Sequence, residues 1–460
     1  MNGQMFVESV RSEGLAHISY MVGHGGKAAV IDPRRDCREY IDIAHRYGAA
    51  ITLIFETHRN EDYVVGSCEL AHRTGAEIHH GRALDFRYGN PVKDGDRFDL
   101  GDLSLTVLET PGHTFESISL VLTDTSMGSE PVGVFTGDAL FIGDVGRTDF
   151  FPGREEEVAG LLYDSIFGKL LPLGDHVILY PGHGAGSVCG KGMAPRDFST
   201  IGYERKHNAV LRMTERRDFV KFKASEFHYK PPYFMMMEKL NLEGAAPLLS
   251  GIHAPRPLSV AEFSAAAQRG AVVLDTRSPE AFAGAFIPGS LSVPLSMVPA
   301  MAGYYLPYDK DILLVVNDDV ADVNTAVRYL RRLGYDRVTG YLAGGMWEWE
   351  TNGLAYDRIP AVHVEELVRR IRAGDKFTLL DVRGADEVKD GRLPGSLHVY
   401  VGELPARLDD IPADRPITTF CESGSRGIIA ASILKRNGFK AVEDSLGSMA
   451  ACRATGCPIV

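Results

Sequence analysis

A segment of the C-terminal half of the chain occurs twice, with a constant offset of 106 residues (380 against 274). Residues 274–277 and 287–293 recur without a gap as residues 380–383 and 393–399, and Leu, Asp, Arg, Pro, Gly, Ser, Leu and Val are identical. Each copy continues with an apolar strand, a short polar loop and a helical pattern that ends at a glycine. Strand, loop and helix in the same order twice predict two small α/β domains with parallel sheets.

The composition limits the classes of protein to which the chain can belong. Its 460 residues are enough for about three domains of roughly 150 residues each. The net charge of −12, from 49 Lys and Arg against 61 Asp and Glu, argues against nucleic acid or an anionic membrane surface as the main partner. No apolar run approaches the ~18 residues of a membrane-spanning helix, and the N-terminus lacks the pattern of a signal peptide. Six cysteines without a CxxC pair are too few for a disulfide scaffold, so we expect a cytoplasmic, reduced protein whose cysteine chemistry is catalytic.

The second copy carries a cysteine in the loop between its strand and its helix. This loop, residues 421–426, reads Cys-Glu-Ser-Gly-Ser-Arg. A cysteine at a helix N-terminus lies near unpaired N–H groups and the positive end of the helix dipole, which lower the pKa of a thiol and stabilise its thiolate. Gly424 and the two serines let the backbone form a cradle of amides, and Arg426 adds a fixed positive charge. Such a pocket suits a cysteine persulfide, which is itself an anion near neutral pH.

The loop resembles that of rhodanese (sulfurtransferase) domains, and the resemblance extends to both copies. It implies that Cys421 carries sulfane sulfur and that Arg426 is a second catalytic residue. It also implies that the remaining loop residues bind the substrate: Glu422, Ser423, Gly424 and Ser425.

The first copy lacks the cysteine. Alignment on the strand places Val316 at the position of Cys421, whereas alignment on the helix places Asn317 there. Two aspartates follow and would repel an anion, so this copy resembles an inactive rhodanese with a role in spacing, docking or dimerisation. Near the end of the second copy, Cys452 and Cys457 are interpreted as packing residues.

Four apolar strands in the N-terminal half each lead, through a small or turn residue, to a side chain that can bind a metal. A lone histidine at a strand end is usually a surface residue, but four such ends in one domain indicate a constructed site. The four side chains are His58, His113, Asp138 and His183.

This pattern resembles the metallo-β-lactamase fold, a four-layer αββα sandwich with metals at one edge. In that family the motif Thr-His-x-His-x-Asp-His supplies ligands to two metals, whereas residues 57–63 read Thr-His-Arg-Asn-Glu-Asp-Tyr. Asn60 and Tyr63 therefore replace two histidines, one from each metal site. Since neither remaining set would close well around its own ion, a binuclear zinc hydrolase is not the expected form.

Two imidazoles and one carboxylate remain, from His58, His113 and Asp138. They match the facial triad of non-haem iron(II) oxygenases, although some catalytic zinc sites use the same set. Asp62 and His183 would either add ligands to the metal or contact the triad residues and fix their orientation.

Residues 137–141 and 146–150 resemble the persulfide dioxygenase branch of the family, which uses one Fe(II) held by His, His and Asp. The resemblance implies one Fe(II) per chain, in preference to zinc, and a structural or substrate-binding role for Arg147. Cys189, six residues after His183, is interpreted as a loop or buried cysteine without a role, with a persulfide-carrying thiol as the alternative. The expected order is a lactamase-like domain, an inactive rhodanese-like domain and an active rhodanese domain, over residues 1–245, 255–357 and 360–460.

The combined resemblance implies an enzyme that oxidises a low-molecular-weight thiol persulfide with O₂ to sulfite and thiol. A persulfide on Cys421 would then pass its outer sulfur to sulfite and give thiosulfate. One alternative is a zinc thioester hydrolase of the glyoxalase II type with a separate sulfur relay, which predicts two metals per chain and activity without oxygen. Another is a sulfur carrier whose lactamase-like domain is inactive. The expected partners are the persulfide, O₂, sulfite and a second copy of the chain, because related enzymes often self-associate.

Overall fold

The structure is a computed structural model that describes residues 5–187, 189–190, 192–248, 254–317 and 320–460. The chain divides into two compact units. The first comprises residues 1–251 with 331–334, and the second comprises residues 252–330 and 335–460. Among the described residues, no helix has both the length and the apolar character needed to cross a bilayer.

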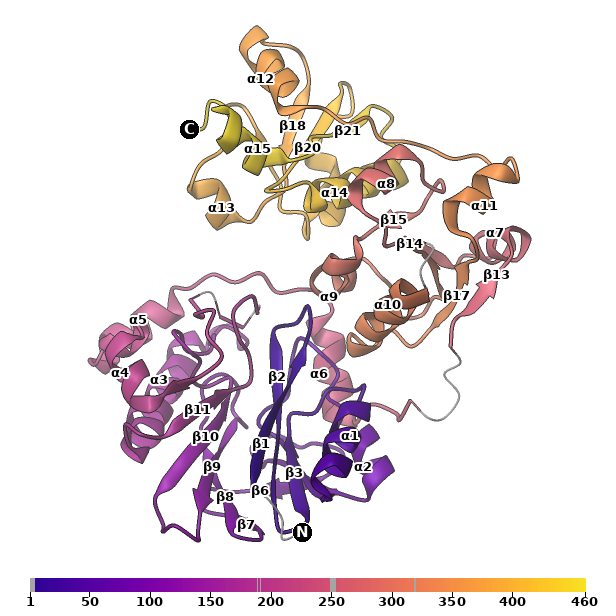
Figure 1. The fold of residues 1–460 in the computed structure, drawn as a ribbon. Coiled ribbons are helices and arrows are strands. Elements are labelled where there is room, and N and C mark those ends of the chain that lie inside the picture. Colours follow the sequence, from indigo (N-terminus) through magenta and orange to yellow (C-terminus); the bar gives the residue numbers. More distant parts are fainter. Residues whose placement is uncertain (1–4, 188, 191, 249–253, 318–319) are drawn as a thin grey trace. The chain divides into compact units, whose positions relative to one another are not determined.

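The described residues of the first unit form two six-stranded sheets (Figure 1). In one sheet the strands lie in sequence order: β1 (Phe6–Ser12), β2 (His17–His24), β3 (Lys27–Ile31), β4 (Ala50–Glu56), β5 (Glu77–Gly81) and β6 (Asn90–Val92). In the other they lie in reverse order: β12 (Ser199–Thr200), β11 (Ile178–Pro181), β10 (Pro131–Gly137), β9 (Ile118–Asp124), β8 (Leu103–Glu109) and β7 (Arg97–Leu100).

The two sheets face each other across an apolar core. Because side chains alternate along a strand, Ile18, Tyr20 and Val22 of β2 point into this core while Met21 packs on the opposite face of its sheet. From the second sheet, Leu105 of β8 packs into the same core. Alternating burial on both faces is what a sheet needs when it is covered by a second sheet on one side and by helices on the other.

Helices cover the outer face of each sheet (Figure 1). Over the β1–β6 sheet pack α1 (Arg38–Tyr47) and α2 (Ser67–Thr74); over the other pack α3 (Glu155–Ser165), α4 (Ile201–His207) and α5 (Arg216–Ala224). A further helix, α6 (Phe234–Glu243), follows along the chain. The layers are therefore helix, sheet, sheet and helix, which confirms the αββα sandwich predicted from the sequence.

The second unit contains two parallel sheets of matching strand order. The first has the order β13 (Arg256–Leu258), β17 (Val338–Leu342), β16 (Ile312–Val315), β14 (Val272–Asp275) and β15 (Leu291–Ser292). The second has the order β21 (Val442–Asp444), β20 (Ile417–Phe420), β18 (Thr378–Asp381) and β19 (Leu397–His398). The helices are α7 (Val260–Gln268), α8 (Pro279–Gly284), α9 (Val298–Met301), α10 (Val320–Arg332), α11 (Gly345–Thr351), α12 (Val364–Ala373), α13 (Ala385–Lys389), α14 (Ser425–Arg436) and α15 (Ser448–Thr455). Two parallel α/β sheets in the repeated region confirm the prediction made from the repeat.

The Asp-x-Arg motif of the repeat forms the same buried ion pair in both copies. Arg383 donates from Nη2 to Asp381 Oδ2 (2.6 Å) and to the carbonyl of Gly391 (2.9 Å). Arg277 donates likewise to Asp275 (2.7 Å) and to the carbonyl of Ala285, which lies 106 residues before Gly391. The motif therefore holds the chain after the strand in place, and this explains why it is also present in the copy without a cysteine.

The structure differs from the sequence interpretation at two cysteines. Cys452 is buried in the core of the second copy, as a packing residue would be, but it is also joined to Cys457 by a disulfide. Cys452 lies in α15 and Cys457 follows shortly after the helix ends, with their Cα atoms 4.9 Å apart. The expectation of wholly reduced cysteines is therefore wrong for this pair in the structure. Of the described cysteines, Cys37, Cys68, Cys189 and Cys421 are free.

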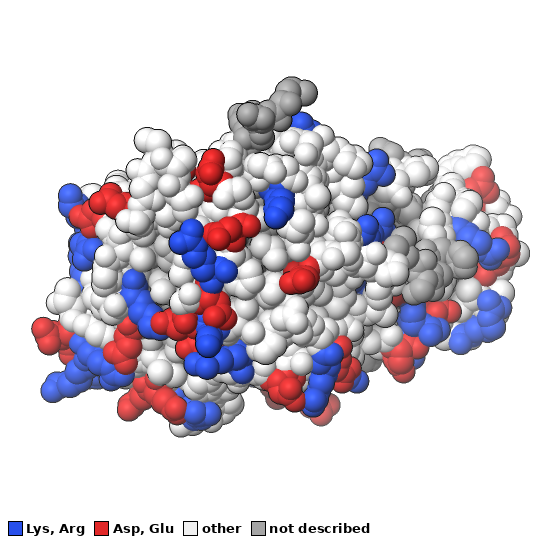
Figure 2. Space-filling view, turned by 90° about the horizontal axis from the view of Figure 1, so that it is seen from below, with Lys and Arg blue, Asp and Glu red and all other residues white. Residues whose placement is uncertain are grey.

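Charged side chains of both signs are mixed on the face of the molecule that Figure 2 shows. On the face shown in Figure 2, Lys and Arg alternate with Asp and Glu, and neither sign covers a large continuous area.

Candidate metal centre and sulfur-transfer loop

Four strand ends of the first unit bring metal-binding side chains to one edge of the sandwich. His58 follows β4, His113 follows β8, Asp138 follows β10 and His183 follows β11. Since β8 and β10 are both antiparallel to β9, and β11 is parallel to β10, three of these strands end at the same edge of their sheet. All four side chains are buried.

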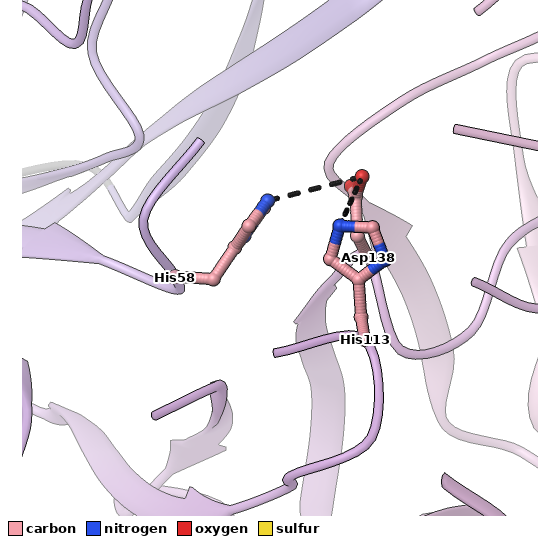
Figure 3. A group of neighbouring side chains, drawn as sticks. All are labelled: His58, His113 and Asp138. Atoms are coloured by element: carbon pink, nitrogen blue, oxygen red, sulfur yellow. Dashed lines mark ion pairs between the residues drawn. The ribbon is translucent and has the colours of Figure 1, made fainter. Parts of the chain in front are cut away.

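His58, His113 and Asp138 converge on a common point (Figure 3). Asp138 Oδ2 lies 3.8 Å from His58 Nε2 and 3.5 Å from His113 Nε2. Neither Nε2 atom has a hydrogen-bond partner among the described residues. Two buried imidazole nitrogens without partners, beside a carboxylate, fit a divalent cation, which would satisfy all three groups at once.

The far side of each imidazole ring fixes its orientation and its protonation. Thr57 Oγ1 donates to Asp32 Oδ2 (2.7 Å) and lies 2.9 Å from His58 Nδ1. Because the hydroxyl proton is committed to Asp32, Thr57 can only accept from His58, so Nδ1 carries the proton and Nε2 keeps its lone pair. His113 Nδ1 lies 3.1 Å from the carbonyl oxygen of Arg147, which also can only accept. Both Nε2 lone pairs therefore face Asp138.

The charge states of His58 and Asp138 suit cation binding. For His113, burial would lower the pKa, but the adjacent Glu61 and Asp138 outweigh it and raise the pKa. Burial, together with neighbouring imidazoles, lowers the pKa of His58 to about 3, so this ring is neutral at physiological pH. Burial alone would raise the pKa of Asp138, but the adjacent His183 and His58 outweigh it and hold the pKa below its ordinary value. A neutral ring and an ionised carboxylate are the forms that bind metals.

A second group of potential ligands lies beside the triad and consists of Asp62, His183 and Cys189. His183 links the two groups, since its Nδ1 donates to Asp138 Oδ1 (2.7 Å) and its Nε2 lies 3.1 Å from Asp62 Oδ2. The sequence interpretation expected no closed second set, because it counted only the histidines of the family motif. Cys189 completes a set of three. Burial and the nearby carboxylates Asp138 and Asp62 raise the pKa of its thiol.

The side chains of the two residues that replace family histidines bond to backbone carbonyls. The amide of Asn60 donates from Nδ2 to the carbonyl of His58 (3.3 Å). The ring of Tyr63 packs on His17, with centroids 4.1 Å apart, and its hydroxyl donates to the carbonyl of Asp32 (3.5 Å). Both residues therefore make contacts that hold the backbone just after β3 and β4.

Arg147 makes structural contacts. Its side chain is fully buried, donates to both carboxylate oxygens of Asp149 (2.7 and 2.8 Å) and lies over the ring of Phe150. Its carbonyl is the group that orients His113. These contacts match the structural role among the two that the sequence left open, and substrate binding by Arg147 stays a prediction.

Sequence reasoning missed Asp32 and used Thr57 only as a spacer. Asp32 follows β3 and has a positive φ of 50°, so it is a fifth strand end that carries a polar side chain. The same pattern of strand followed by Asp could have identified it. Its carboxylate also accepts from the backbone N–H of Thr57 (2.7 Å), which fixes the turn that presents His58.

In the second unit, the loop after β20 holds Cys421 in a buried position. The backbone N–H of Gly424 donates to Cys421 Sγ (3.0 Å), and Ser448 Oγ accepts from the N–H of Cys421 (3.0 Å). Gly424 has a φ of +108°, which a residue with a side chain rarely adopts, and this turn brings its N–H onto the sulfur. An amide directed at the sulfur is the arrangement that stabilises a thiolate or a persulfide anion.

The charged residues of the loop are paired. Arg426, in the first turn of α14, donates to both oxygens of Glu387 (2.6 and 2.7 Å). Burial would lower the pKa of Arg426, but the ion pair with Glu387 outweighs it and raises the pKa. Glu422 is paired with Arg453 of α15. Of the predicted loop residues, Gly424 therefore contacts the sulfur directly, whereas Arg426 and Glu422 are held by partners.

The sheet register decides which residue of the first copy occupies the cysteine position. Asp381 pairs with Phe420, the residue before Cys421, and Asp275 pairs with Val315, the residue before Val316. Val316 therefore stands where Cys421 stands in the second copy. Of the two alternatives left open by the sequence, the alignment on the strand is correct.

The rhodanese-like domain model matches this chain twice, over residues 259–352 and 363–454. A solved metallo-β-lactamase from Staphylococcus aureus is 32% identical, with a TM-score of 0.66, and the match covers 74% of this chain and 99% of that one. The chain is thus a fusion of a metallo-β-lactamase-fold unit with two rhodanese-like domains. It belongs to the metallo-β-lactamase family represented by the S. aureus protein.

Two curated relatives each match up to about half of the chain. Bovine persulfide dioxygenase ETHE1 is 29% identical over 232 residues, which cover 49% of this chain and 77% of that protein. The hydroxyacylglutathione hydrolase GloC of Haemophilus influenzae is 29% identical over 206 residues, which cover 40% and 87%. Other similarities are partial, since the chain spans 45% of an uncharacterized Mycobacterium leprae protein to which it is 40% identical over 120 residues.

Proposed function

We propose that this chain oxidises the terminal sulfur of a low-molecular-weight thiol persulfide with O₂ and then uses the resulting sulfite as a sulfur acceptor. In this proposal residues 1–245 are the dioxygenase, residues 255–357 an inactive rhodanese-like domain and residues 360–460 the active rhodanese. The observation that carries it is the presence, in one chain, of the His58, His113 and Asp138 group and of a sulfur-directed amide at Cys421.

The first reaction is R–S–SH + O₂ + H₂O → R–SH + SO₃²⁻ + 2 H⁺. The S–S bond breaks, the terminal sulfur is oxidised and O₂ is reduced. One Fe(II), bound by the triad, would supply the redox chemistry and the open positions at which the persulfide and O₂ meet. The similarity to persulfide dioxygenase ETHE1 supports the assignment of the persulfide substrate and of the reaction with O₂.

The protein groups around the triad hold its ligands ready. The contacts from Thr57 and from the Arg147 carbonyl hold the Nδ1 side of each imidazole and aim each Nε2 atom inward, so the rings need not reorient when the ion binds. The burial of His58, His113 and Asp138 keeps bulk water away from the reacting sulfur, which limits side reactions of a reactive persulfide.

The second reaction takes place at Cys421. The thiol exchanges with a persulfide, Cys–SH + R–S–SH → Cys–S–SH + R–SH, and sulfite then attacks the outer sulfur: Cys–S–S⁻ + SO₃²⁻ → Cys–S⁻ + S₂O₃²⁻. The N–H of Gly424 stabilises the sulfur anion left on Cys421. Arg426, neutralised in part by Glu387, contributes positive charge beside two reacting anions. Covalent linkage of the two activities raises the local concentration of sulfite for the second step.

The test is oxygen uptake by the Fe(II)-reconstituted chain after addition of glutathione persulfide, with the zinc-loaded chain as control. Uptake in the iron form alone, lost in Asp138→Asn and retained in Cys421→Ser, is the expected result. Cys421→Ser should still form sulfite but no thiosulfate. An unchanged thiosulfate yield in Cys421→Ser contradicts the coupling, and equal absence of uptake in both metal forms contradicts the dioxygenase.

A second candidate is a zinc thioester hydrolase, favoured by the group of Asp62, His183 and Cys189 beside the triad and by the similarity to GloC. It requires two metals per chain and cleaves a glutathione thioester without O₂. Metal content and anaerobic thioester cleavage in the zinc-loaded chain separate the two proposals. One ion per chain and no cleavage eliminate the hydrolase.

A further inference from the structure

We propose that the disulfide of Cys452 and Cys457 is a thiol-exchange site that regulates sulfur transfer at Cys421. A low-molecular-weight thiol with a free carboxylate binds in a pocket beside Cys457, opens the disulfide and thereby slows the transfer. The exchange does not depend on the proposed function; only its effect on sulfur transfer rests on that function.

One cysteine of the pair can be reached from solvent. Cys452 is fully buried, whereas Cys457 is partly exposed and lines a surface pocket of about 490 Å³. The pocket lies between α12 and the end of α15, and its volume falls within the roughly 300–1,000 Å³ of small-molecule sites. A thiol bound there meets Cys457, so the attack is directed to this sulfur and Cys452 is the leaving group.

The charged residues of the pocket favour a ligand with a carboxylate. Two arginines and one glutamate line it, namely Arg369, Arg372 and Glu365. Arg369 already donates to both oxygens of Glu366 (2.7 Å each). Arg372 is exposed, and its side chain has no hydrogen bond or ion pair with any residue of the described chain, so its guanidinium group is available to a bound anion. Because guanidinium groups pair with carboxylates in a bidentate geometry, the pocket selects a carboxylate-bearing thiol over a neutral or cationic one.

The exchange needs no reactant besides the thiol. In the first step, R–SH + Cys457–S–S–Cys452 → Cys457–S–S–R + Cys452–SH, a new S–S bond forms on Cys457 and the old one breaks. The proton lost by the attacking thiol ends on Cys452. A second thiol releases the mixed disulfide, Cys457–S–S–R + R–SH → Cys457–SH + R–S–S–R. Two thiols are thus oxidised while one protein disulfide is reduced.

The opposite end of α15 holds the sulfur-transfer loop. Ser448 Oγ accepts from the N–H of Cys421 (3.0 Å), and the N–H of Met449 donates to the Cys421 carbonyl (3.1 Å). The N–H of Ala450 donates to the carbonyl of Glu422 (2.8 Å). The loop and the disulfide are therefore attached to the two ends of one eight-residue helix.

Opening the disulfide should loosen this helix. The disulfide ties the segment after α15 to its last turn, where the N–H of Cys457 also donates to the Cys452 carbonyl (3.0 Å). Cys452 packs in the same core as Phe420, the residue before Cys421. Loss of a cross-link increases the number of conformations open to the chain. Since a reacting group must be held within about 0.5 Å of its productive position, we expect slower sulfur transfer when the disulfide is open.

The exchange is tested on the full chain purified without reductant. Samples are taken during treatment with glutathione and unfolded in guanidinium chloride with iodoacetamide, which blocks every free thiol. Peptide mass spectrometry then identifies the blocked cysteines. We expect Cys452 and Cys457 to be blocked only after treatment, with a glutathione adduct on Cys457 as the intermediate. Cysteamine, a thiol with an ammonium group and no carboxylate, is the charge control.

Arg372→Ala tests the pocket. Opening of the disulfide by glutathione should become about threefold slower or more, because the variant lacks the partner of the carboxylate, and opening by cysteamine should not slow. Arg415→Ala removes an exposed arginine of the same copy that does not line the pocket. It should open at the wild-type rate with both thiols.

The effect on transfer is measured as thiosulfate formed from sulfite by the chain loaded with persulfide on Cys421, after glutathione has been removed. The turnover rate should fall about threefold or more when the disulfide is open and recover when glutathione disulfide closes it again. Cys457→Ser should show the low rate throughout and not respond to glutathione. Cys68→Ser, which removes a half-buried free cysteine of the first unit, should behave as the wild type does.

Three results overturn the inference. They are free thiols at Cys452 and Cys457 even after treatment with glutathione disulfide, equal opening by glutathione in Arg372→Ala and wild type, and equal transfer rates with the disulfide open and closed. A chain that exchanges thiols as described but consumes no oxygen contradicts the proposed function alone. A chain that forms thiosulfate from persulfide and O₂ at a rate independent of the disulfide contradicts only the thiol-exchange regulation.

Discussion

Gly182 and Asp138 are so close that no side chain fits between them. A Cβ atom placed on Gly182 would lie 2.7 Å from Asp138 Oδ1 and 3.2 Å from the backbone of Gly137. The same Oδ1 accepts from His183, the residue that follows Gly182. The Pro-Gly turn after β11 therefore lets the backbone approach the carboxylate while the next side chain reaches back to hold it.

Gly182→Ala should consequently displace Asp138 and weaken metal binding. We expect a loss of Fe(II) affinity of at least tenfold, because a ligand must stay within a few tenths of an ångström of its bonding position. The measurement is metal content after anaerobic reconstitution and dialysis. Gly168→Ala is the matched control, since a Cβ at Gly168 meets nothing within 4 Å. Equal metal content in the two variants would show that Asp138 tolerates the displacement.

Thr57→Val keeps the size of the side chain and removes the hydroxyl that links Asp32 to His58. Without it His58 loses the acceptor that fixes its Nδ1 proton, so the ring can rotate or exchange tautomers. Loss of such an orienting partner typically costs 10–100-fold in metal affinity, and we expect about this loss for Fe(II). The control Thr52→Val lies in β4, the strand that Thr57 follows, and its hydroxyl makes only a 3.5 Å bond to the carbonyl of Ala28, so this variant should bind Fe(II) as the wild type does. Chelator competition measures both, and similar losses in both variants would argue for a general effect on β4.

Much of the architecture could be predicted because it depends on local patterns. The offset of 106 between Asp275 and Asp381 required two similar domains, and apolar strands ending in His58, His113, Asp138 and His183 required a shared edge. These residues follow strands directly, so their positions are fixed by the period of the strand and by the turn after it.

The contacts that complete the site could not be predicted. They are made between residues far apart in the chain, and they depend on which way each side chain or carbonyl points in the folded protein. Nothing in the sequence shows that the Arg147 carbonyl faces His113, or that Cys189 lies beside Asp62 and His183. The loop of residues 57–63 illustrates the limit. A motif comparison shows which histidines are missing, but only the structure shows that the side chains of Asn60 and Tyr63 bond to the carbonyls of His58 and Asp32.

The buried Asp-Arg pairs of the two repeat copies predict equal mutational costs. Arg383→Ala leaves Asp381 buried without its partner, and Arg277→Ala does the same to Asp275. Breaking a buried pair in this way costs about 3–5 kcal/mol, so both variants should lower the urea midpoint of the second unit substantially. Arg369→Ala removes an exposed partner of Glu366. It should change the free energy of unfolding by less than about 1 kcal/mol and therefore leave the urea midpoint nearly unchanged. A mild effect of Arg277→Ala alone would show that the first copy does not need its ion pair.

The pH dependence of the second unit should arise in part from Asp444. Burial, together with the nearby Glu280, raises the pKa of Asp444 to about 7, although Thr419 Oγ1 donates to its Oδ1 (2.7 Å). In the unfolded chain the same carboxyl ionises near its ordinary value of 3.8. Between about pH 4 and pH 7 the unfolded state therefore releases a proton that the folded state keeps, so the free energy of unfolding falls as the pH rises and levels off above pH 7.

Three units of pKa difference correspond to on the order of 4 kcal/mol across that window. Asp444→Asn cannot titrate and should remove this slope, whatever its effect on stability at any single pH. Urea unfolding of the full chain at pH 5, 6, 7 and 8 gives the comparison, with the exposed Asp309→Asn as control for the loss of one charge. The quantity to compare is the urea midpoint of Asp444→Asn minus that of the wild type. This difference should become more positive from pH 5 to pH 7 and then stay constant. A constant difference over the whole range would mean that Asp444 is ionised in the folded protein throughout, and that Thr419 and the backbone around it stabilise the charge more strongly than burial opposes it.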